Sequence, residues 1–190
     1  MAPIELPKGA PIERYHIPAR VNWLLVVGKN PLPEGMTPVA VTEDYTLVRL
    51  SADFRLAGSA RFSEPYGKGI VSGAEGLSHA EPWGRWSTAK HVVLHFKQAL
   101  PKQVRIGFKA RAFNVNATLP FTMRVGGQEK SFRVSEYEQE LSLEFATDGA
   151  QRSLDIEVPH PVSPQELGLS VDVRKLGIGL GAVEVYDTGH

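Results

Sequence analysis

Alternation of apolar and polar residues is the feature of this sequence that most constrains its fold. From about residue 60 onward, apolar side chains occupy every second position of a series of short segments. Successive side chains on a β-strand point to opposite faces, so each segment has one apolar and one solvated face. Two sheets of this kind bury their apolar faces by packing against each other. The alternating segments are 92–96, 104–112, 121–125, 132–134, 141–145, 154–158 and 183–185.

Residues typical of tight turns separate these segments. Gly126-Gly127 lies between two alternating runs and tolerates the positive φ angles of a tight hairpin, and Asp148-Gly149 is expected to form a second hairpin between Phe145 and Leu154. Many short strands joined by such turns are typical of a sandwich or jelly roll. The sequence therefore predicts an all-β fold, a two-sheet antiparallel β-sandwich that is jelly-roll-like, over residues 60–190.

A small strand-rich leading segment is predicted to precede the sandwich. The first 20 residues contain four prolines and indicate an extended lead-in. The β-branched run at 23–27 favours a buried strand, and the runs at 39–41 and 45–50 are typical of a hairpin. We therefore assign residues 1–55 to a leading unit of extended chain and short strands.

One short helix is predicted late in the chain. Ser163 supplies a capping hydroxyl, Pro164 suits the first helical position, and Glu166 is placed to reach back to the cap. Gly168 would end the helix after about one turn. We interpret this element as a connector between strands.

Composition excludes several classes of function. Lys plus Arg and Asp plus Glu both number 21, so a net charge of zero provides no field for capturing nucleic acid. The absence of cysteine removes disulfides, thiolate nucleophiles and the best zinc ligands. No run of about 18 apolar residues and no signal-peptide pattern is present, so we expect neither a transmembrane segment nor an export signal in these residues.

Metal and nucleotide sites are not expected. His91 and His95 have a spacing that would join two metal ligands on a helix, but on a strand four residues span about 13 Å. We therefore expect two histidines on a solvated face, no metal site and no cofactor. The glycines of 177–181 precede a strand-like run and not a helix, so we interpret them as a strand with a bulge or a close backbone approach.

The densest group of functional side chains is the heptapeptide Glu81-Pro82-Trp83-Gly84-Arg85-Trp86-Ser87. Sugars present C–H faces that stack on aromatic rings and hydroxyls that suit planar polar groups such as guanidinium and carboxylate. A carbohydrate-binding patch is one interpretation. The other is equally physical: a tryptophan that fills the core and an arginine that pairs with a carboxylate. A second polar cluster, Arg111, Asn114 and Asn116, follows a strand and would either line the same rim or cap a loop.

These segments resemble a domain at the C-terminus of bacterial phosphoglycerol transferase-like and membrane glycosyltransferase-like proteins. The resemblance spans about residues 60–188 and rests on residues 76–78, 81–87, 110–116, 159–168 and 174–180, which add His160 and Arg174 to the candidate binding residues. Residues 20–50 are similar to the segment after the last membrane span of such proteins. The resemblance implies a periplasmic or extracytoplasmic location at the inner membrane, beside an enzyme that builds or decorates a glycan. This chain lacks the membrane spans and any transferase metal site, so we assign no catalytic residues.

The sequence thus predicts a non-catalytic, carbohydrate-binding accessory domain, with a fold like that of carbohydrate-binding modules. Its expected partners are a glycan or glycolipid of the cell envelope and the membrane-embedded remainder of a parent polypeptide, and not nucleic acid. One alternative is a scaffold or oligomerisation domain without a sugar site. A further alternative, a stand-alone glycan-active enzyme, needs two carboxylates about 5–10 Å apart in one cleft. The candidate carboxylates are Glu81, Asp155, Glu157 and Asp172.

Overall fold

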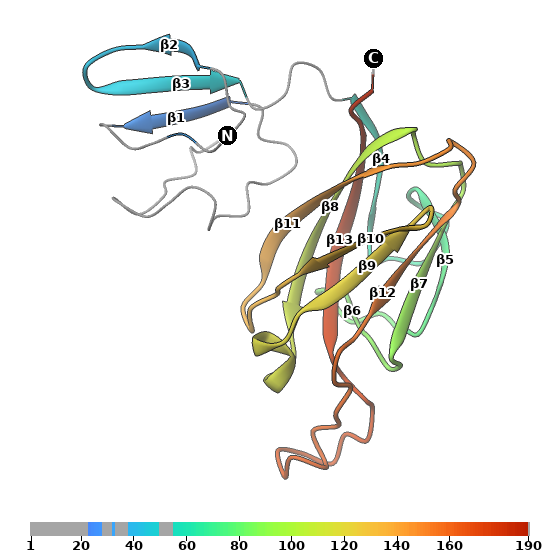
Figure 1. Cartoon of the computed structure of the whole chain (residues 1–190). Coiled ribbons are helices and arrows are strands. Elements are labelled where there is room, and N and C mark those ends of the chain that lie inside the picture. The colour runs from blue at the N-terminus through green and yellow to red at the C-terminus, as the bar shows by residue number, and fades with distance from the viewer. Residues whose placement is uncertain (1–22, 28–31, 33–37, 50–54, 190) are drawn as a thin grey trace.

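The computed structural model describes residues 23–27, 32, 38–49 and 55–189 of the chain. The strands in these residues form one three-stranded sheet and two larger sheets, and the larger two belong to the part of the chain that follows residue 55 (Figure 1). Neighbouring strands are antiparallel in all of the pairs recorded between named strands.

The two larger sheets make up the sandwich. The first has the strand order β10-β9-β12-β7-β5, and the second has the order β11-β8-β13-β4, with β6 also paired to β13. The strands of the first sheet are β5 (Val71–Glu75), β7 (His91–Phe96), β9 (Phe121–Val125), β10 (Gln128–Phe132) and β12 (Ser153–Glu157). Those of the second are β4 (Arg55–Arg61), β6 (Arg85–Trp86), β8 (Gln103–Ala112), β11 (Gln139–Ala146) and β13 (Ile178–Asp187).

Apolar side chains from both sheets form one continuous core. In β7 and β12 the buried positions recur at every second residue, and the longer β8 keeps the same period. Burial at period two is what packs one face of each sheet against the other. The predicted two-sheet antiparallel sandwich is therefore confirmed. The largest fully buried side chains of the sandwich are Phe62, Leu94, Leu100, Ile106, Phe121, Met123, Leu141, Leu154, Ile156, Ile178 and Leu180.

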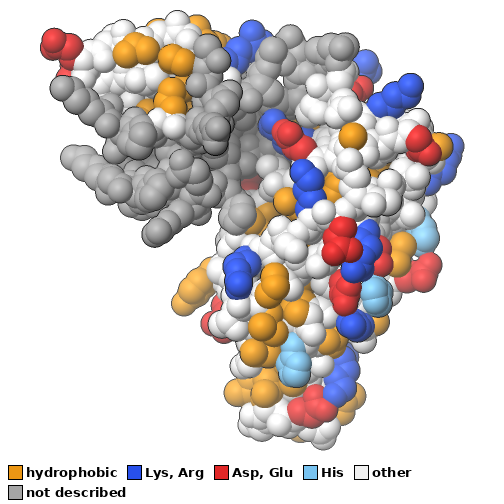
Figure 2. Space-filling model, in the orientation of Figure 1, with side chains coloured by type: hydrophobic (Ala, Val, Ile, Leu, Met, Phe, Trp, Pro, Cys, Tyr) orange, Lys and Arg blue, Asp and Glu red, His pale blue; other side chains and the backbone are white. Residues whose placement is uncertain are grey.

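The outer face of the first sheet carries paired charges. His91 lies 3.0 Å from a carboxylate oxygen of Asp155 on β12, and the Arg124 guanidinium of β9 lies 2.7 Å from Glu157. His95 pairs with a glutamate of β5 at 2.9 Å, so both histidines lie on the solvated face, as predicted. Figure 2 shows acidic, basic and histidine side chains side by side over the sandwich. Cross-strand pairs of this kind each stabilise a sheet modestly.

Of the two hairpins predicted within the sandwich, one is confirmed and the other is wrong. β9 and β10 are joined by Gly126 and Gly127, both with positive φ, and pair in register from Val125 opposite Gln128. The segment containing Asp148-Gly149 instead connects β11 to β12, which belong to different sheets. Turn residues mark a reversal of the chain, but they do not reveal whether the next strand pairs with the previous one or crosses the sandwich.

The leading residues contain a three-stranded antiparallel sheet of order β1-β3-β2, built from β1 (Trp23–Val27), β2 (Pro38–Val41) and β3 (Tyr45–Arg49). The predicted hairpin is present as β2 and β3. The prediction of a buried strand at 23–27 is wrong in detail, because exposed and buried residues alternate along β1. The proline-rich lead-in of residues 1–20 lies outside the described residues, and the division of the chain into 1–55 and 60–190 stays a prediction.

The predicted helix near residue 165 is replaced by a hydrogen-bonded turn. The capping interactions are formed: the Ser163 N–H donates to Glu166 Oε2 (3.0 Å), and the Glu166 N–H donates to Ser163 Oγ (3.2 Å). Gly168 then takes a positive φ and ends the turn, so no helix follows. The helical element η2 (Asn114–Thr118) is a 3-10 helix after β8. Across the described residues, no helix is long and apolar enough to cross a membrane.

Close contact between the heptapeptide and the start of β13 positions the candidate site. β6 pairs with β13 through Trp86 opposite Gly179. Ser87 is fully buried, and its hydroxyl accepts a hydrogen bond from the Ile178 N–H (2.9 Å). A Cβ atom at Gly84 would lie 2.1 Å from the Leu180 carbonyl oxygen, so this position admits only glycine. The predicted close approach and bulge in the glycine-rich segment are both confirmed, since the register with β8 shifts between Leu180 and Ala182.

Replacing Gly84 by alanine is expected to force β6 away from β13. The atoms nearest to the added methyl group are all backbone atoms, which cannot rotate aside. Overpacking of this kind costs about 2 kcal/mol of unfolding free energy. Gly73→Ala on β5 is the control, because nothing lies within 4 Å of its Cβ position. Urea unfolding measures the free energy of unfolding of both variants. Equal free energies for Gly84→Ala and Gly73→Ala would contradict the close approach.

Candidate functional site

The candidate site begins with a tight reversal of the chain before β6. Glu81 and Gly84 exchange two backbone hydrogen bonds of 2.8 and 3.1 Å, which place Pro82 and Trp83 at the tip. The Trp83 and Trp86 rings meet edge to face, with centroids 5.1 Å apart and an interplanar angle of 67°. Both indoles are half-buried, so each has a packed part and an accessible part. Neither ring therefore fills the core completely, and neither is fully exposed as a binding surface.

The two indoles occupy space that a glycine leaves free. A Cβ atom at Gly179 would lie 2.7 Å from Trp83 Cη2 and 3.0 Å from Trp86 Cε3. Arg111 of β8 lies opposite Gly179 in the sheet register. Its guanidinium carbon is 3.8 Å from the Trp83 ring centroid and 4.9 Å from that of Trp86, within the range of cation–π attraction. Three strands thus contribute to one aromatic–guanidinium cluster.

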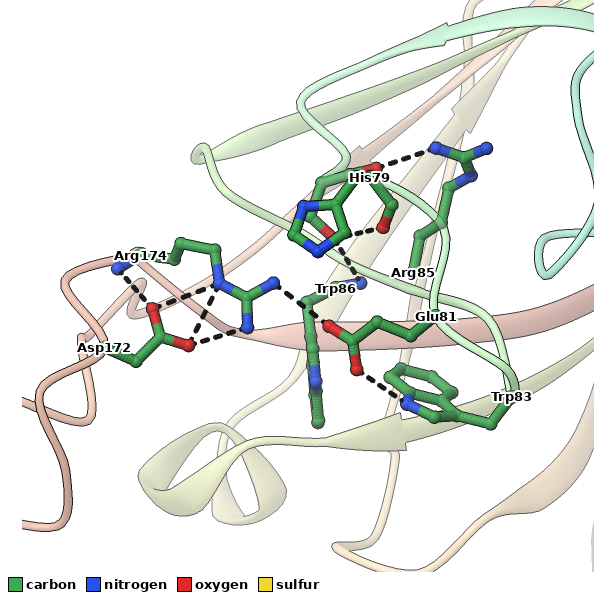
Figure 3. A network of polar contacts seen from close by, with 8 residues as sticks. His79, Glu81, Trp83, Arg85, Trp86, Asp172 and Arg174 are labelled. Atoms are coloured by element: carbon green, nitrogen blue, oxygen red, sulfur yellow. Dashed lines mark hydrogen bonds and ion pairs between the residues drawn. The ribbon is translucent and has the colours of Figure 1, made fainter.

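A network of polar contacts fixes the orientation of Trp83 (Figure 3). The Trp83 indole N–H donates to Glu81 Oε2 (2.9 Å), and Arg174 Nη1 donates to Glu81 Oε1 (3.0 Å). Arg174 also donates to both carboxylate oxygens of Asp172, at 2.6 to 3.1 Å. The Arg174 guanidinium holds the pKa of the Asp172 carboxyl below its usual range. The network therefore links the tip of the heptapeptide to the segment before β13.

Arg85 points away from this network. Its Nε donates to the Phe62 carbonyl (3.0 Å) and its Nη1 donates to the Ser78 carbonyl (2.9 Å), with a longer contact to the Glu64 carbonyl at 3.4 Å. The guanidinium also lies 4.4 Å from the centre of the Tyr66 ring. Its donors are thus engaged with backbone carbonyls. We assign Arg85 a structural role and leave it out of the proposed binding surface.

The second polar cluster is divided between the surface and the interior. Asn116 in η2 is fully buried, and its amide donates to the carbonyls of Phe113 (3.0 Å) and His160 (2.8 Å) while accepting from the His160 N–H (3.0 Å). Asn116 therefore joins two loops and is not available to a ligand. Asn114 and the His160 side chain are exposed, and Asn114 has a positive φ of 52°.

The other carboxylates considered from the sequence are ion-paired. Asp155 pairs with His91, and Glu157 accepts from Arg124 and Lys90. The hydrogen bond from Arg124 holds the pKa of Glu157 below its usual range. Among the residues that the structure describes, no group of three or more His, Asp or Glu side chains is arranged to hold a metal ion.

Of the nine residues predicted as binding candidates, the structure joins Glu81, Trp83, Trp86, Arg111 and Arg174 in one cluster of contacts. Phe113 joins the same cluster, with its ring centroid 5.9 Å from that of Trp86. Sequence reasoning treated Asp172 only as a possible catalytic acid and missed that it orients Arg174. The two-residue spacing of Asp172 and Arg174 was the available signal, because side chains two apart on extended chain lie on the same side.

Comparison with known proteins identifies the family. Residues 51–187 match the family described as Domain of unknown function (DUF7024). The chain belongs to this family. The match includes every residue of the cluster described above and all of the sandwich strands up to the end of β13.

The curated relatives are transferases of greater length. Phosphoglycerol transferase I of Salmonella typhi and that of Salmonella typhimurium are each 36% identical to this chain over 116 residues, which cover 59% of this chain and 15% of the relative. This chain thus spans about 15% of the length of these relatives. The resemblance to a domain of bacterial phosphoglycerol transferase-like proteins is confirmed.

Solved structures with a similar fold include BiXyn10A CBM1 and the C-terminal CBM6 of LamC from Zobellia galactanivorans. The first has a TM-score of 0.43 and 11% identity, covering 72% of this chain and 99% of that one. The second has a TM-score of 0.41 and 5% identity, covering 70% of this chain and 98% of that one. At these scores the assignment of a β-sandwich rests on the strand order and the core of this chain itself.

Substitution of Arg85 by methionine is expected to destabilise the sandwich by about 2 kcal/mol, because it leaves half-buried carbonyls without donors. Arg133→Met is the matched control, since Arg133 is exposed and bonds one carbonyl, that of Thr118. The control is expected to cost less than about 1 kcal/mol. Thermal and urea unfolding measure both values. An Arg85 variant as stable as the control would argue against the structural role.

Proposed function

We propose that this chain is a non-catalytic, carbohydrate-binding accessory domain of a phosphoglycerol transferase-like enzyme of the bacterial cell envelope. Its binding surface consists of Trp83, Trp86 and Arg111, bordered by Glu81 and Arg174. The exposed side chains of Asn114 and His160 are candidates for its rim.

The observation that carries this proposal is the pair of half-buried indoles beside a guanidinium. An indole that is held on one side and open on the other provides a rigid apolar surface for the C–H face of a sugar. Glu81 fixes the Trp83 ring through its N–H, so little rotational freedom is lost when a ligand stacks on it. Planar donors beside the rings suit the hydroxyls at the edge of the sugar.

Ion pairing of the nearby carboxylates supports a binding role in preference to hydrolysis. Glu81 and Asp172 are both bonded to Arg174, and its guanidinium holds the pKa of the Asp172 carboxyl below its usual range. A glycosidase of the common two-carboxylate kind needs one carboxyl group that stays protonated near neutral pH. Both oxygens of Glu81 are instead engaged as hydrogen-bond acceptors, one by the Trp83 N–H and the other by Arg174.

The sequence relationship supports the choice of parent enzyme. Relatives that share this segment are named phosphoglycerol transferase I and are much longer than this chain. We infer that the domain is part of such a membrane-anchored polypeptide, on the extracytoplasmic side of the inner membrane. There it would bind a glycan or glycolipid of the envelope and hold it near the transferase.

Titration with neutral oligosaccharides tests the proposal. Trp23→Phe removes the tryptophan of β1 and leaves Trp83 and Trp86 as the fluorescent reporters. In this background we expect a β-linked glucose or mannose pentasaccharide to change the emission with a Kd on the order of 0.1–1 mM, because an open, solvated site retains little free energy after desolvation. Trp83→Ala is expected to weaken binding at least about tenfold.

Arg133→Lys and the exposed Tyr137→Ser are controls for this titration, since neither side chain belongs to the proposed surface. Both are expected to bind like the background protein. Isothermal titration calorimetry measures the heat of binding and does not depend on tryptophan fluorescence. The proposal fails if no oligosaccharide of the panel produces heat or a fluorescence change.

A second candidate function is docking to the parent polypeptide, and it rests on a different observation. The segment before β13 exposes four apolar side chains at alternate positions: Leu167 (38%), Leu169 (62%), Val171 (91%) and Val173 (64%). Figure 2 shows hydrophobic side chains gathered at the end of the molecule where this segment lies in Figure 1. Contiguous apolar side chains on a surface mark interaction sites.

The docking function predicts weak self-association of the isolated chain, because the apolar segment would contact a second copy when its partner is missing. Light scattering after size exclusion is expected to show an average mass that rises with concentration. The double variant Val171→Ser/Val173→Ser is expected to abolish the rise, whereas the exposed but isolated Tyr137→Ser leaves it unchanged. A wild-type chain that stays monomeric throughout would contradict the predicted self-association through this segment.

A further inference from the structure

Arg111 differs from the other arginines of the site in its partners. Arg85 donates to backbone carbonyls and Arg174 donates to two carboxylates. Among the described residues, Arg111 has no hydrogen-bond acceptor and no ion pair, and its Nε is buried without a partner. Its recorded contacts are the faces of Trp83 and Trp86. The guanidinium is therefore oriented by ring stacking alone.

Stacking leaves the donors of a guanidinium available in its own plane. The N–H groups point outward from the edge of the planar group, whereas the rings contact its face. Two parallel N–H donors in this arrangement match a carboxylate or a phosphate oxygen pair better than they match a single hydroxyl. A buried polar donor normally has an acceptor, so an unpaired one makes its guanidinium a candidate contact for a ligand atom.

The nearby carboxylates do not accept hydrogen bonds from Arg111. Both oxygens of Glu81 are occupied, one by the Trp83 N–H and the other by Arg174. Asp172 is held by Arg174 through both of its oxygens. Lys109, two residues before Arg111 on β8, lies 3.7 Å from Glu138. The carboxylates around the cluster are thus engaged with other cations.

We propose that the sugar bound at this surface carries a single negative charge, a carboxylate or a phosphodiester, and that Arg111 binds this acidic group while an indole stacks on the sugar ring. The four charged groups of the cluster, Glu81, Asp172, Arg111 and Arg174, are neutral in sum, so one negative charge is tolerated better than two. This inference rests on the proposed function and specifies the class of ligand.

The test compares three ligands of one sugar on the same protein. Methyl β-glucoside is neutral, methyl β-glucuronide carries a carboxylate, and glucose 6-phosphate methyl ester carries a phosphodiester. Two-dimensional ¹H–¹⁵N spectra follow the Trp83 indole and Arg111 Nε resonances during titration. We expect one of the acidic ligands or both to bind about five- to tenfold more tightly than the neutral one, as is typical of a single charge-assisted hydrogen-bonded pair. The two acidic ligands distinguish a uronic acid from a phosphodiester as the natural group.

Variants assign the preference to Arg111. Arg111→Gln is expected to bring the acidic-to-neutral ratio of affinities close to one, and Arg111→Lys to retain part of it. Arg133→Gln removes an exposed arginine elsewhere and is expected to leave the ratio unchanged. If Arg111→Gln does not fold, the wild-type comparison still decides whether the ligand is acidic, and the partial loss expected of Arg111→Lys assigns the preference to Arg111.

The remaining outcomes contradict the inference, the role of Arg111 or the proposed function. Equal affinities of wild type for acidic and neutral sugars overturn this inference but leave the proposed function intact. A preference that survives Arg111→Gln overturns the role of Arg111. Failure of every ligand, including the neutral pentasaccharides above, overturns both the inference and the proposed function.

Discussion

The close approach of the heptapeptide to the start of β13 is the constraint on which the candidate site depends. Gly84 lies against the Leu180 carbonyl, and Gly179 leaves the room that both indoles fill. Ser87 seals the contact, since its N–H donates to the Ile178 carbonyl (2.7 Å) and its hydroxyl accepts in return. A side chain at either glycine would separate β6 from β13. The rings would then lose the backing that keeps them half-buried and in fixed orientation.

The fold could be predicted from the sequence, whereas the site, which depends on this long-range contact, could be predicted only in part. Period-two burial is a local property, and it located the strands of the sandwich from sequence. Which way a charged side chain points depends on the register of strands far apart in the chain. Arg85 and Arg111 look equivalent in sequence, yet one meets backbone carbonyls and the other meets two indoles. Asn116 was expected either to line the rim or to cap a loop, and the second alternative holds, because its buried amide joins two loops.

The error in the predicted helix has a local origin. The capping pattern at Ser163 and Glu166 forms as expected, but the chain leaves the turn at Gly168 before a helix can propagate. A first helical turn fixes several residues for one hydrogen bond, so a cap alone does not guarantee a helix. Lys175 also bonds Glu166 and, with the Ser163 contacts, lowers its pKa to about 2. The capping carboxylate thus remains charged at neutral pH without a helix beyond it.

The indole surface and the apolar segment before β13 are joined through one ion pair. Val171 and Val173 flank Asp172, the residue that orients Arg174, and Arg174 in turn bonds the glutamate that holds the Trp83 indole. Displacement of the apolar segment would therefore change the position of Arg174 relative to Glu81. Binding of a partner at the apolar segment and binding of a sugar at the indoles share this contact. The sign of any coupling between them depends on whether the partner holds Asp172 in place or draws it away.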